Sequence, residues 1–336
     1  MRLLLATHPT YLEHDTGSGH PERPSRLDAV FAGIDAAGLR GALIPFAPRP
    51  ASLEEVHQVH EVAMLARLEA IAAGGGGAID PDTVASSASY DAALLAAGAG
   101  LEAIERLDAG EAEAAFCAVR PPGHHATPSR AMGFCLVNNV AVAASRLAAR
   151  GERVLIVDYD AHHGNGTQDI FYADPRVAYV SLHQYPLYPG SGAADEVGVG
   201  AGRGTTVNLP MPAGATGEVY RAAFDRVVLP FAERFAPTWL LVSAGFDAHR
   251  RDPLTQLGLT SGDFADLTVA LMGLVPAGCR LLFLEGGYDL QGLAASAGAT
   301  LAALAEVPYR PEPASAHGPG LEVVEVVEAI QQQFAD

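Results

Sequence analysis

Short apolar runs alternate with longer alanine-rich stretches along most of the chain. The short runs are bounded by turn residues, a pattern typical of strands buried on both faces of a parallel sheet. They span residues 115–119, 153–157, 177–182, 238–243 and 280–284. The longer stretches have helical patterns and span residues 89–107, 138–149, 217–235, 261–274 and 290–305. This alternation predicts an α/β fold with a largely parallel central sheet and helices on both faces.

The chain shows no sign of a linker between domains. It has 336 residues, which is long for one domain, but α/β folds built on one large sheet reach this length. Proline and glycine occur in short turn-like clusters, and the longest biased run is residues 74–77. The sequence therefore predicts a single domain over residues 1–336.

Composition and charge exclude several function classes. The formal net charge of −18 provides no basic patch to displace counterions from phosphates, so we expect no nucleic-acid partner. The apolar run at residues 3–6 is too short for a secretory signal, and no run reaches the roughly 18 residues of a membrane span. We therefore expect a soluble, cytoplasmic protein without a membrane partner. The sequence leaves open whether the chain forms a homo-oligomer.

Polar and ionisable residues gather directly after the predicted strands. They lie at residues 120–125, 158–165, 181–183, 244–249 and 285–288. The ligand crevice of an open α/β sheet lies outside the carboxyl ends of its strands. The sequence therefore predicts that these loops meet at one site.

The loop after residues 153–157 reads Asp-x-Asp-x-His. In an extended chain Asp158, Asp160 and His162 would project to one side, and such a row is costly to bury without a cation. Two carboxylates and a neutral imidazole, from Asp160, Asp247 and His162, would balance a divalent ion and leave a position for water. Alternatively the aspartates cap a helix and the histidine is an ordinary loop residue, but this reading must then hold independently at several strand ends.

A pair of adjacent histidines, His124 and His125, follows residues 115–119. Beside a metal-bound water, one can act as general base and acid while the other is a positively charged stabiliser. Each needs a partner on its second ring nitrogen, and Asp158 and Asn165 are available. Tyr288 follows the last strand and could hydrogen-bond an oxyanion, although a core tyrosine is about as common in such a place.

Taken together, these motifs resemble the histone deacetylase and acetylpolyamine amidohydrolase family, in particular its bacterial class II histone deacetylase-like amidohydrolases. The resemblance covers residues 19–24, 120–125, 133–135, 158–166, 181–183, 245–252 and 285–288. It implies the arginase/deacetylase fold. It also implies a zinc-dependent deacetylase that hydrolyses the amide of an N-acetylated or N-acylated amine of the acyl-lysine type.

The resemblance further implies a role for each residue at the site. The zinc ligands would be Asp160, His162 and Asp247. The catalytic residues would be His125 as general base and then acid, His124 as its electrostatic partner paired with Asp158, Asn165 beside His125, and Tyr288 on the scissile carbonyl. Asn165 stands where class I members carry an aspartate, and its neutrality should make His125 harder to protonate.

Two further sets of positions are implied by the same resemblance. A structural potassium ion would be bound by Asp158, Asp160, His162, Ser181 and Leu182. The substrate tunnel would be walled by Gly133, Phe134 and Tyr188, with Leu254 at its mouth and Asp82 anchoring the substrate backbone. Arg26 would lie near the internal channel through which the acid product leaves.

Three other functions stay open at this point. The chain could act on acetylpolyamines, it could be a binuclear manganese ureohydrolase of the same fold, or it could bind acylated amines without cleaving them. A second metal should require more Asp and His ligands than the Asp-x-Asp-x-His run offers, and retention of Tyr288 and both histidines argues against a silent binder. Outside the motifs, His57 and His60 are expected to be satisfied or solvated, and His14 has no clustered partner.

Overall fold

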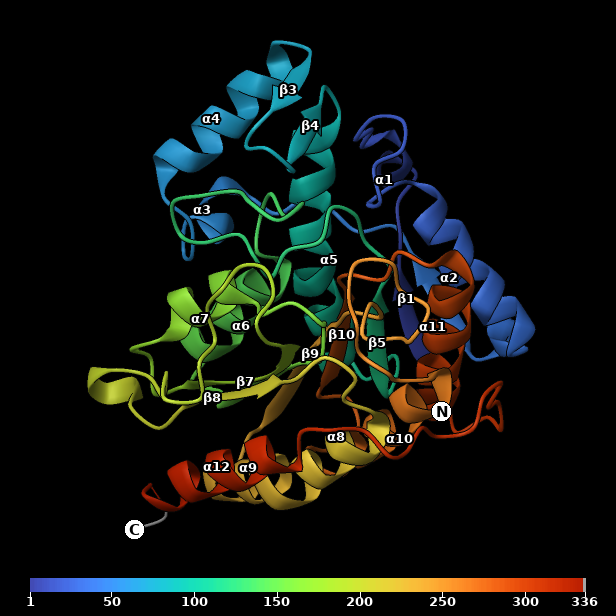
Figure 1. The fold of residues 1–336 in the computed structure, drawn as a ribbon. Helices are drawn as coiled ribbons and strands as arrows, with labels where there is room; N and C mark the ends of the chain where they lie inside the picture. Colours follow the sequence, from blue (N-terminus) through green and yellow to red (C-terminus); the bar gives the residue numbers. More distant parts are fainter. Residues whose placement is uncertain (335–336) are drawn as a thin grey trace.

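The computed structural model describes residues 1–334, and a single eight-stranded sheet forms its centre (Figure 1). Neighbouring strands in this sheet are parallel, in the order β2-β1-β5-β10-β9-β6-β7-β8. The bounds are β1 Leu3–Ala6, β2 Leu43–Phe46, β5 Ala114–Cys117, β6 Val154–Asp158, β7 Val177–Gln184, β8 Thr206–Met211, β9 Trp239–Ala244 and β10 Arg280–Leu284. Strands β3 (Gly76–Ala78) and β4 (Val84–Ser86) form a separate antiparallel hairpin.

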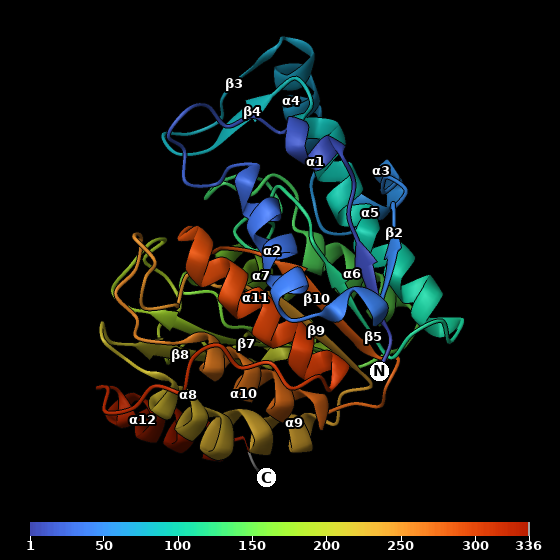
Figure 2. The ribbon, with the colours of Figure 1, turned by 90° about the vertical axis from the view of Figure 1, so that its right-hand side faces the viewer.

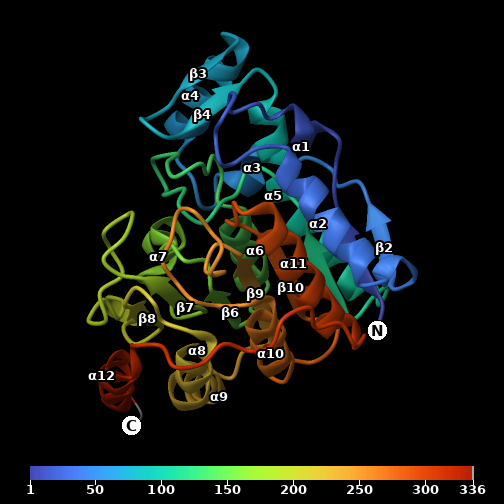
Figure 3. The same ribbon diagram turned by 45° about the vertical axis from the view of Figure 1, so that its right-hand side comes forward.

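Helices cover both faces of the sheet (Figures 2 and 3). On one face lie α2 Ser25–Ala36, α11 Leu290–Ala305, α10 Ser261–Met272 and α8 Gly217–Ala223, with α12 Leu321–Gln332 against α8 and β8. On the other lie α5 Ser89–Asp108, α6 Asn139–Ala149 and α7 Asn165–Phe171. The sheet is therefore covered on both sides, which is why every residue of β5, β6, β7, β9 and β10 is buried.

The predicted α/β fold with a parallel central sheet is confirmed. Each of the five predicted strands exists, with ends that differ by at most two residues. The helix predicted over 217–235 has these ends but contains a π-helical turn, Phe224–Val228, between α8 and α9 (Leu229–Phe235). The sequence reading did not include the edge strands β2 and β8, nor β1.

A smaller unit rises from the carboxyl ends of the strands (Figure 1). It contains α4 (Val62–Ala73) and the β3–β4 hairpin, which pack against α5. The remaining short helices are α1 Thr10–Glu13 and α3 Leu53–Val56. The loop between β3 and β4 points back toward the strand ends, where His20 Nε2 donates to the carbonyl oxygen of Asp82 at 3.1 Å. Within residues 1–334, no helix has both the length and the apolar character needed to cross a bilayer.

Candidate active site

A cavity of about 220 Å³ opens at the carboxyl ends of the central strands. Its walls come from the loops after β5, β6, β7, β9 and β10, and from the β3–β4 loop. The lining residues are Asp82, His125, Gly133, Phe134, His162, Leu187, Tyr188, Leu254 and Tyr288. The loops that the sequence pattern assigned to one site therefore do meet.

Asp160, His162 and Asp247 come together at the base of this cavity. One ligand atom from each lies within 4.8 Å of the other two. His162 Nδ1 is 2.9 Å from Asp247 Oδ2 and 3.3 Å from Asp160 Oδ1. The structure thus joins the loop after β6 to the loop after β9 in the arrangement that the sequence predicted.

The charges of this cluster fit a divalent cation. Both carboxylates are almost fully buried, and burial together with Asp160 raises the pKa of Asp247 to about 7. Although burial disfavours a charged imidazole, hydrogen bonds to Asp160 and Asp247 raise the pKa of His162 to about 10. Protons therefore balance the buried charge when no cation is bound, and an Asp₂His donor set is one that Zn²⁺ accepts.

Backbone amides hold both carboxylates in place. The N–H of Ala161 donates to Asp247 Oδ1 at 2.8 Å, and that of Gly286 donates to Asp160 Oδ2 at 2.7 Å. A Cβ at Gly286 would lie 2.3 Å from Asp247 Oδ2, so a larger residue would push into the cluster. The turn after β10 is therefore shaped around the two acids.

The two adjacent histidines have different partners. His124 Nδ1 donates to Asp158 Oδ2 at 3.0 Å, and His125 Nδ1 donates to Asn165 Oδ1 at 2.9 Å. Burial opposes charge on His124, but Asp158 and Asp160 raise its pKa to about 10. Burial, and then the charges of the neighbouring histidines, lower the pKa of His125 well below its usual range. One ring is therefore cationic and the other neutral near pH 7.

Asp158 lies beside the cluster of Asp160, His162 and Asp247 and is not part of it. Its Oδ2 accepts from His124 and also from the hydroxyl of Tyr179 at 3.0 Å, so it faces the histidine pair. Ser181 is its partner in the β6–β7 register, and Leu182 follows, with its carbonyl oxygen accepting from Tyr220 at 3.3 Å. The positions implied for potassium are thus neighbours, and its binding stays a prediction.

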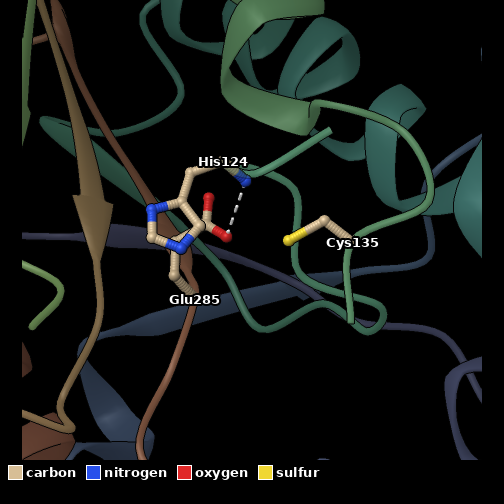
Figure 4. A group of neighbouring side chains, drawn as sticks. All are labelled: His124, Cys135 and Glu285. Carbon is tan, nitrogen blue, oxygen red and sulfur yellow. Dashed lines mark hydrogen bonds between the residues drawn. The ribbon is translucent and has the colours of Figure 1, made fainter. Parts of the chain in front are cut away.

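Glu285 hydrogen-bonds the backbone of the loop that carries the two histidines, a role that was not predicted from the sequence (Figure 4). Its Oε2 accepts the backbone N–H groups of Gly123 at 2.7 Å and of His124 at 3.2 Å. Burial raises the pKa of this carboxyl to about 7. The signal in the sequence was its place directly before the Gly286-Gly287-Tyr288 turn.

His124, Cys135 and Glu285 also have the spacing of metal ligands (Figure 4). Two of the three side chains already have partners, because Glu285 Oε2 accepts two backbone amides and His124 Nδ1 donates to Asp158. Burial, and then Glu285, raises the pKa of the Cys135 thiol well above its usual range. A protonated thiol is a poor metal ligand, so we interpret these three residues as stabilising the histidine loop and not as binding a metal.

A buried ion cluster supports the site from the sheet side. Arg120 Nη2 donates to Glu22 Oε2 at 2.7 Å, and Arg26 Nη1 donates to Glu22 Oε1 at 3.1 Å. Arg26 Nε also donates to the carbonyl oxygen of Gly287 at 2.8 Å, behind Tyr288. The expectation that His14 has no partner is wrong, since its Nε2 lies 3.4 Å from Glu22 Oε2. A second partner, the Ser89 hydroxyl at 2.6 Å from His14 Nδ1, comes from a segment far away in sequence, which local spacing cannot reveal.

Aromatic side chains form the wall of the cavity. The rings of Phe134 and Tyr288 meet edge to face at 5.8 Å, and those of His125 and Tyr188 at 5.1 Å. Gly133 has φ +57°, and a Cβ there would lie 2.6 Å from His125 Cδ2, so only glycine lets the wall approach the histidine. The residues expected to wall the tunnel therefore line the observed cavity.

The mouth of the cavity has one acidic and one apolar side. Asp82 lines it on the side of the β3–β4 loop, and Leu254 and Leu187 line it elsewhere. Leu254 is 37% exposed, and its N–H donates to Asp252 Oδ1 at 3.0 Å. Asp252 Oδ2 also accepts the N–H of Tyr288 at 2.7 Å. Asp252 thus couples the rim to Tyr288, and neither it nor Leu187 was assigned a role from the sequence.

His60 is a satisfied core histidine, as the sequence suggested. Its Nδ1 donates to the carbonyl oxygen of Thr127 and its Nε2 accepts from the N–H of Asn138, both at 2.9 Å. Burial lowers its pKa to about 4. It fixes the loop that carries Gly133 and Phe134 without lining the cavity.

Known proteins are similar to this chain in both sequence and fold. Residues 20–304 match the histone deacetylase domain. A probable deacetylase of Archaeoglobus fulgidus is 40% identical over 91% of this chain and 89% of its own, and a histone deacetylase-like amidohydrolase of Pseudomonas aeruginosa is 39% identical over 83% and 75%. The crystal structure of the HDA15 HD domain superposes with a TM-score of 0.92 at 39% identity, over 99% of this chain and 95% of that one. The chain belongs to the histone deacetylase family of deacetylases and amidohydrolases, on the arginase/deacetylase fold.

Proposed function

We propose that this chain, as one deacetylase domain, is a zinc-dependent hydrolase that cleaves the amide of N-acylated amines of the acyl-lysine type. The observation that carries the proposal is the placement of Asp160, His162 and Asp247 at the base of an aromatic-walled cavity, with the histidine pair beside them. A narrow wall of this kind suits the aliphatic stem of a lysine side chain.

The roles of the protein groups follow from their partners. A bound zinc ion supplies a Lewis acid that lowers the pKa of water and polarises an amide carbonyl. Because its Nδ1 donates to Asn165, neutral His125 presents Nε2 as the base that takes a proton from the attacking water and returns it to the leaving amine. Cationic His124, held by Asp158, stabilises negative charge nearby.

Tyr288 completes the proposed chemistry. Burial raises the pKa of its phenol well above the usual range, so the hydroxyl keeps its proton and can donate to a developing oxyanion. Phe134 and Tyr188 exclude water from the stem of the substrate. We also propose that potassium binds beside the zinc at the positions named above, where Asp158 and Ser181 are neighbours.

The alternatives have less support. Apart from the Asp₂His cluster, the group with metal-ligand spacing within residues 1–334 is that of His124, Cys135 and Glu285. In it Glu285 Oε2 and His124 Nδ1 have hydrogen-bond partners and the raised pKa of Cys135 keeps the thiol protonated, so a binuclear site is not favoured. A silent binder would have no need of a neutral histidine beside a cationic one. Acetylpolyamines remain the second candidate substrate, because the chain carries a charge of −18.

The test is hydrolysis by the zinc-loaded protein of an acetyl-lysine peptide, acetylputrescine, acetylspermidine and a small neutral acetylated amine. Released acetate measures hydrolysis of every substrate, because acetylputrescine and acetylspermidine carry free amines of their own. Replacing Asp160, His162 or Asp247 by Ala should remove most bound zinc, measured by mass spectrometry, together with activity. Full zinc content with no turnover of any substrate contradicts the enzyme and favours a binding protein.

A further inference from the structure

A second cavity lies close to the mouth of the first. It encloses about 130 Å³ between α4, the β3–β4 loop and the loop of residues 129–131. Its wall is apolar at Met64, Leu68 and Ile79. Two arginines, Arg67 and Arg130, also line it.

These two arginines differ from most others in the chain. The sequence has 39 acidic residues and 21 basic ones, all arginine, and exposed arginines commonly pair with a carboxylate, as Arg40 does with Asp35. Among residues 1–334, Arg67 and Arg130 have no such partner, and neither guanidinium donates a hydrogen bond. Two exposed arginines without a carboxylate partner on one small cavity leave positive charge available to an anion.

One acidic residue, Asp80, lines the same cavity, and its carboxylate is partly engaged. Its Oδ1 accepts the backbone N–H groups of Asp82 at 3.1 Å and of Thr83 at 2.7 Å. The residues that line this cavity therefore carry a net charge of +1, and Asp82, which interacts with Asp80, lies on the side of the first cavity. Ser129 adds a hydroxyl group to the wall, so an incoming anion would meet both charge and hydrogen-bond donors.

The two cavities are lined by nearby residues of the same two loops. Asp80 lines the second and Asp82 the first, and Ala131 lines the second while Gly133 lines the first. Two residues of extended chain span at most about 7 Å. A peptide with its acylated side chain in the first cavity can therefore reach the second with a residue one or two positions away.

We propose that Arg67 and Arg130 form an anion subsite that binds an acidic side chain adjacent to the acyl-lysine of a peptide substrate. This inference rests on the proposed acyl-lysine hydrolysis and adds a sequence preference to it. Arginine binds carboxylates and phosphates in a bidentate manner, so an aspartate, a glutamate or a phosphoserine would satisfy the subsite. Small acylated amines would enter the first cavity without using it.

The test uses the zinc-loaded protein and a set of acetyl-lysine peptides, each with a single Glu in place of Gln at position −2, −1, +1 or +2. At low salt we expect kcat/KM to favour Glu over Gln about five- to tenfold at one of these positions, with phosphoserine favoured at least as much. The preference should fall toward unity at about 0.5 M NaCl, where exposed charges are screened. The combined variant Arg67→Gln and Arg130→Gln should lose it. Arg146→Gln, an exposed unpaired arginine on α6, is the matched control and should keep it.

Each outcome decides the proposal. Equal rates for Glu and Gln peptides in the wild-type protein overturn the subsite while leaving the proposed deacetylase intact, and so does a preference that survives in the double variant. A preference for phosphoserine alone supports the subsite and identifies phosphate as its ligand. If no peptide is hydrolysed, the proposed function is wrong. Binding of fluorescein-labelled Glu and Gln peptides to the wild type and the double variant, measured by fluorescence anisotropy, then decides whether the arginines bind the acidic residue.

Discussion

At the scale of single residues, surroundings give identical side chains different properties. His124 and His125 are adjacent and both buried, yet one faces the carboxylate of Asp158 and the other the neutral amide of Asn165. The pKa of His124 rises to about 10, and that of His125 falls. A general base must be neutral at the working pH, so these partners assign the proposed roles.

This assignment predicts the effect of Asn165→Asp on the pH profile. A carboxylate on Nδ1 would stabilise protonated His125 and raise its pKa, so the base would be lost at a higher pH as the solution is acidified. We expect the acidic limb of the kcat/KM profile to move upward by roughly one to two pH units. Tyr288→Phe serves as the control, since it should lower the rate without moving that limb. An unmoved limb in the Asn165 variant would mean that another group sets it.

Tyr288→Phe tests the proposed oxyanion donor. The variant should keep its fold and zinc, because the ring contacts of Phe134 and Arg26 with this side chain do not need the hydroxyl. We expect kcat on acetyl substrates to fall by roughly 10²- to 10³-fold, with a smaller loss on the more reactive trifluoroacetyl amides. Steady-state kinetics decides this, and an unchanged kcat would place the hydroxyl outside the reaction.

Leu254→Glu tests which amines the mouth of the cavity accepts. Leucine offers no charge to the distant ammonium of a polyamine but can contact the backbone and stem of an acyl-lysine. Wild-type protein should therefore favour an acetyl-lysine peptide over acetylspermidine and acetylputrescine in kcat/KM, and the variant should narrow or reverse that ratio. A wild-type preference for acetylputrescine of about tenfold or more would show that Leu254 is not the selector and favour the polyamine alternative.

At the scale of elements, five buried strands and the long helices could be predicted from the sequence, whereas the two edge strands and β1 could not. Strand β10 and helix α11 have the predicted bounds, because burial on all sides requires unbroken apolar or alanine-rich runs. Strand β2 is four residues at the sheet edge with Pro45 exposed, and β8 contains Asn208 and Pro210. Edge strands tolerate proline and polar residues, so they lack the signal of a buried strand.

The site residues that directly follow strands could be predicted from the sequence. The residues that hold them in place from remote segments of the chain could not. The Asp160, His162 and Asp247 cluster formed as expected, because carboxyl ends of parallel strands share one edge. Glu22 pairs with Arg120 across 98 residues of sequence, and no local pattern reports such a contact. Sequence spacing therefore identified groups that line the cavity and missed several that hold them in place.

The loop after β7 illustrates such a support. Its residue Tyr188 walls the cavity, and Glu196 holds the loop, since Glu196 Oε1 accepts the N–H of Ala193 at 3.1 Å and Oε2 accepts from Gln168 Nε2 at 2.5 Å. His183 Nε2 donates to the carbonyl oxygen of Gly192 at 3.0 Å from the strand itself. The tunnel wall is thus fixed by groups that do not touch the cavity.

We expect Glu196→Gln to loosen this wall. Loss of charge-assisted hydrogen bonds should raise KM for acyl-lysine peptides about three- to tenfold while kcat changes less, because the catalytic groups lie on other loops. Glu328→Gln is the matched control, since Glu328 accepts two hydrogen bonds from Arg226 far from the cavity. A loss confined to kcat, or an equal effect of the control, would contradict a role in positioning Tyr188.

At the scale of the whole molecule, the apolar core around the parallel sheet holds two buried carboxylates, those of Asp160 and Asp247, close together. The strands around the site are fully buried and mostly apolar, so the fold should persist without metal. Inside it, Asp160 and Asp247 repel each other unless a proton or a cation lies between them. Stability without metal should therefore depend on pH through this pair.

The sign of that dependence follows from Asp247. Its pKa is about 7 in the folded protein and about 3.8 when unfolded, so between these values the folded state holds a proton that the unfolded state lacks. The contribution of Asp247 to the free energy of unfolding is fully present below about pH 4 and is lost as the pH rises through about 7. We expect the melting temperature of EDTA-treated protein to fall on the order of 5 °C more over this interval in wild type than in Asp247→Asn, which has no such proton. Added zinc should restore the wild type at pH 7 and leave the variant nearly unchanged. Parallel pH profiles for the two metal-free proteins, measured by calorimetry, would show that this pair does not carry the strain that a cation relieves.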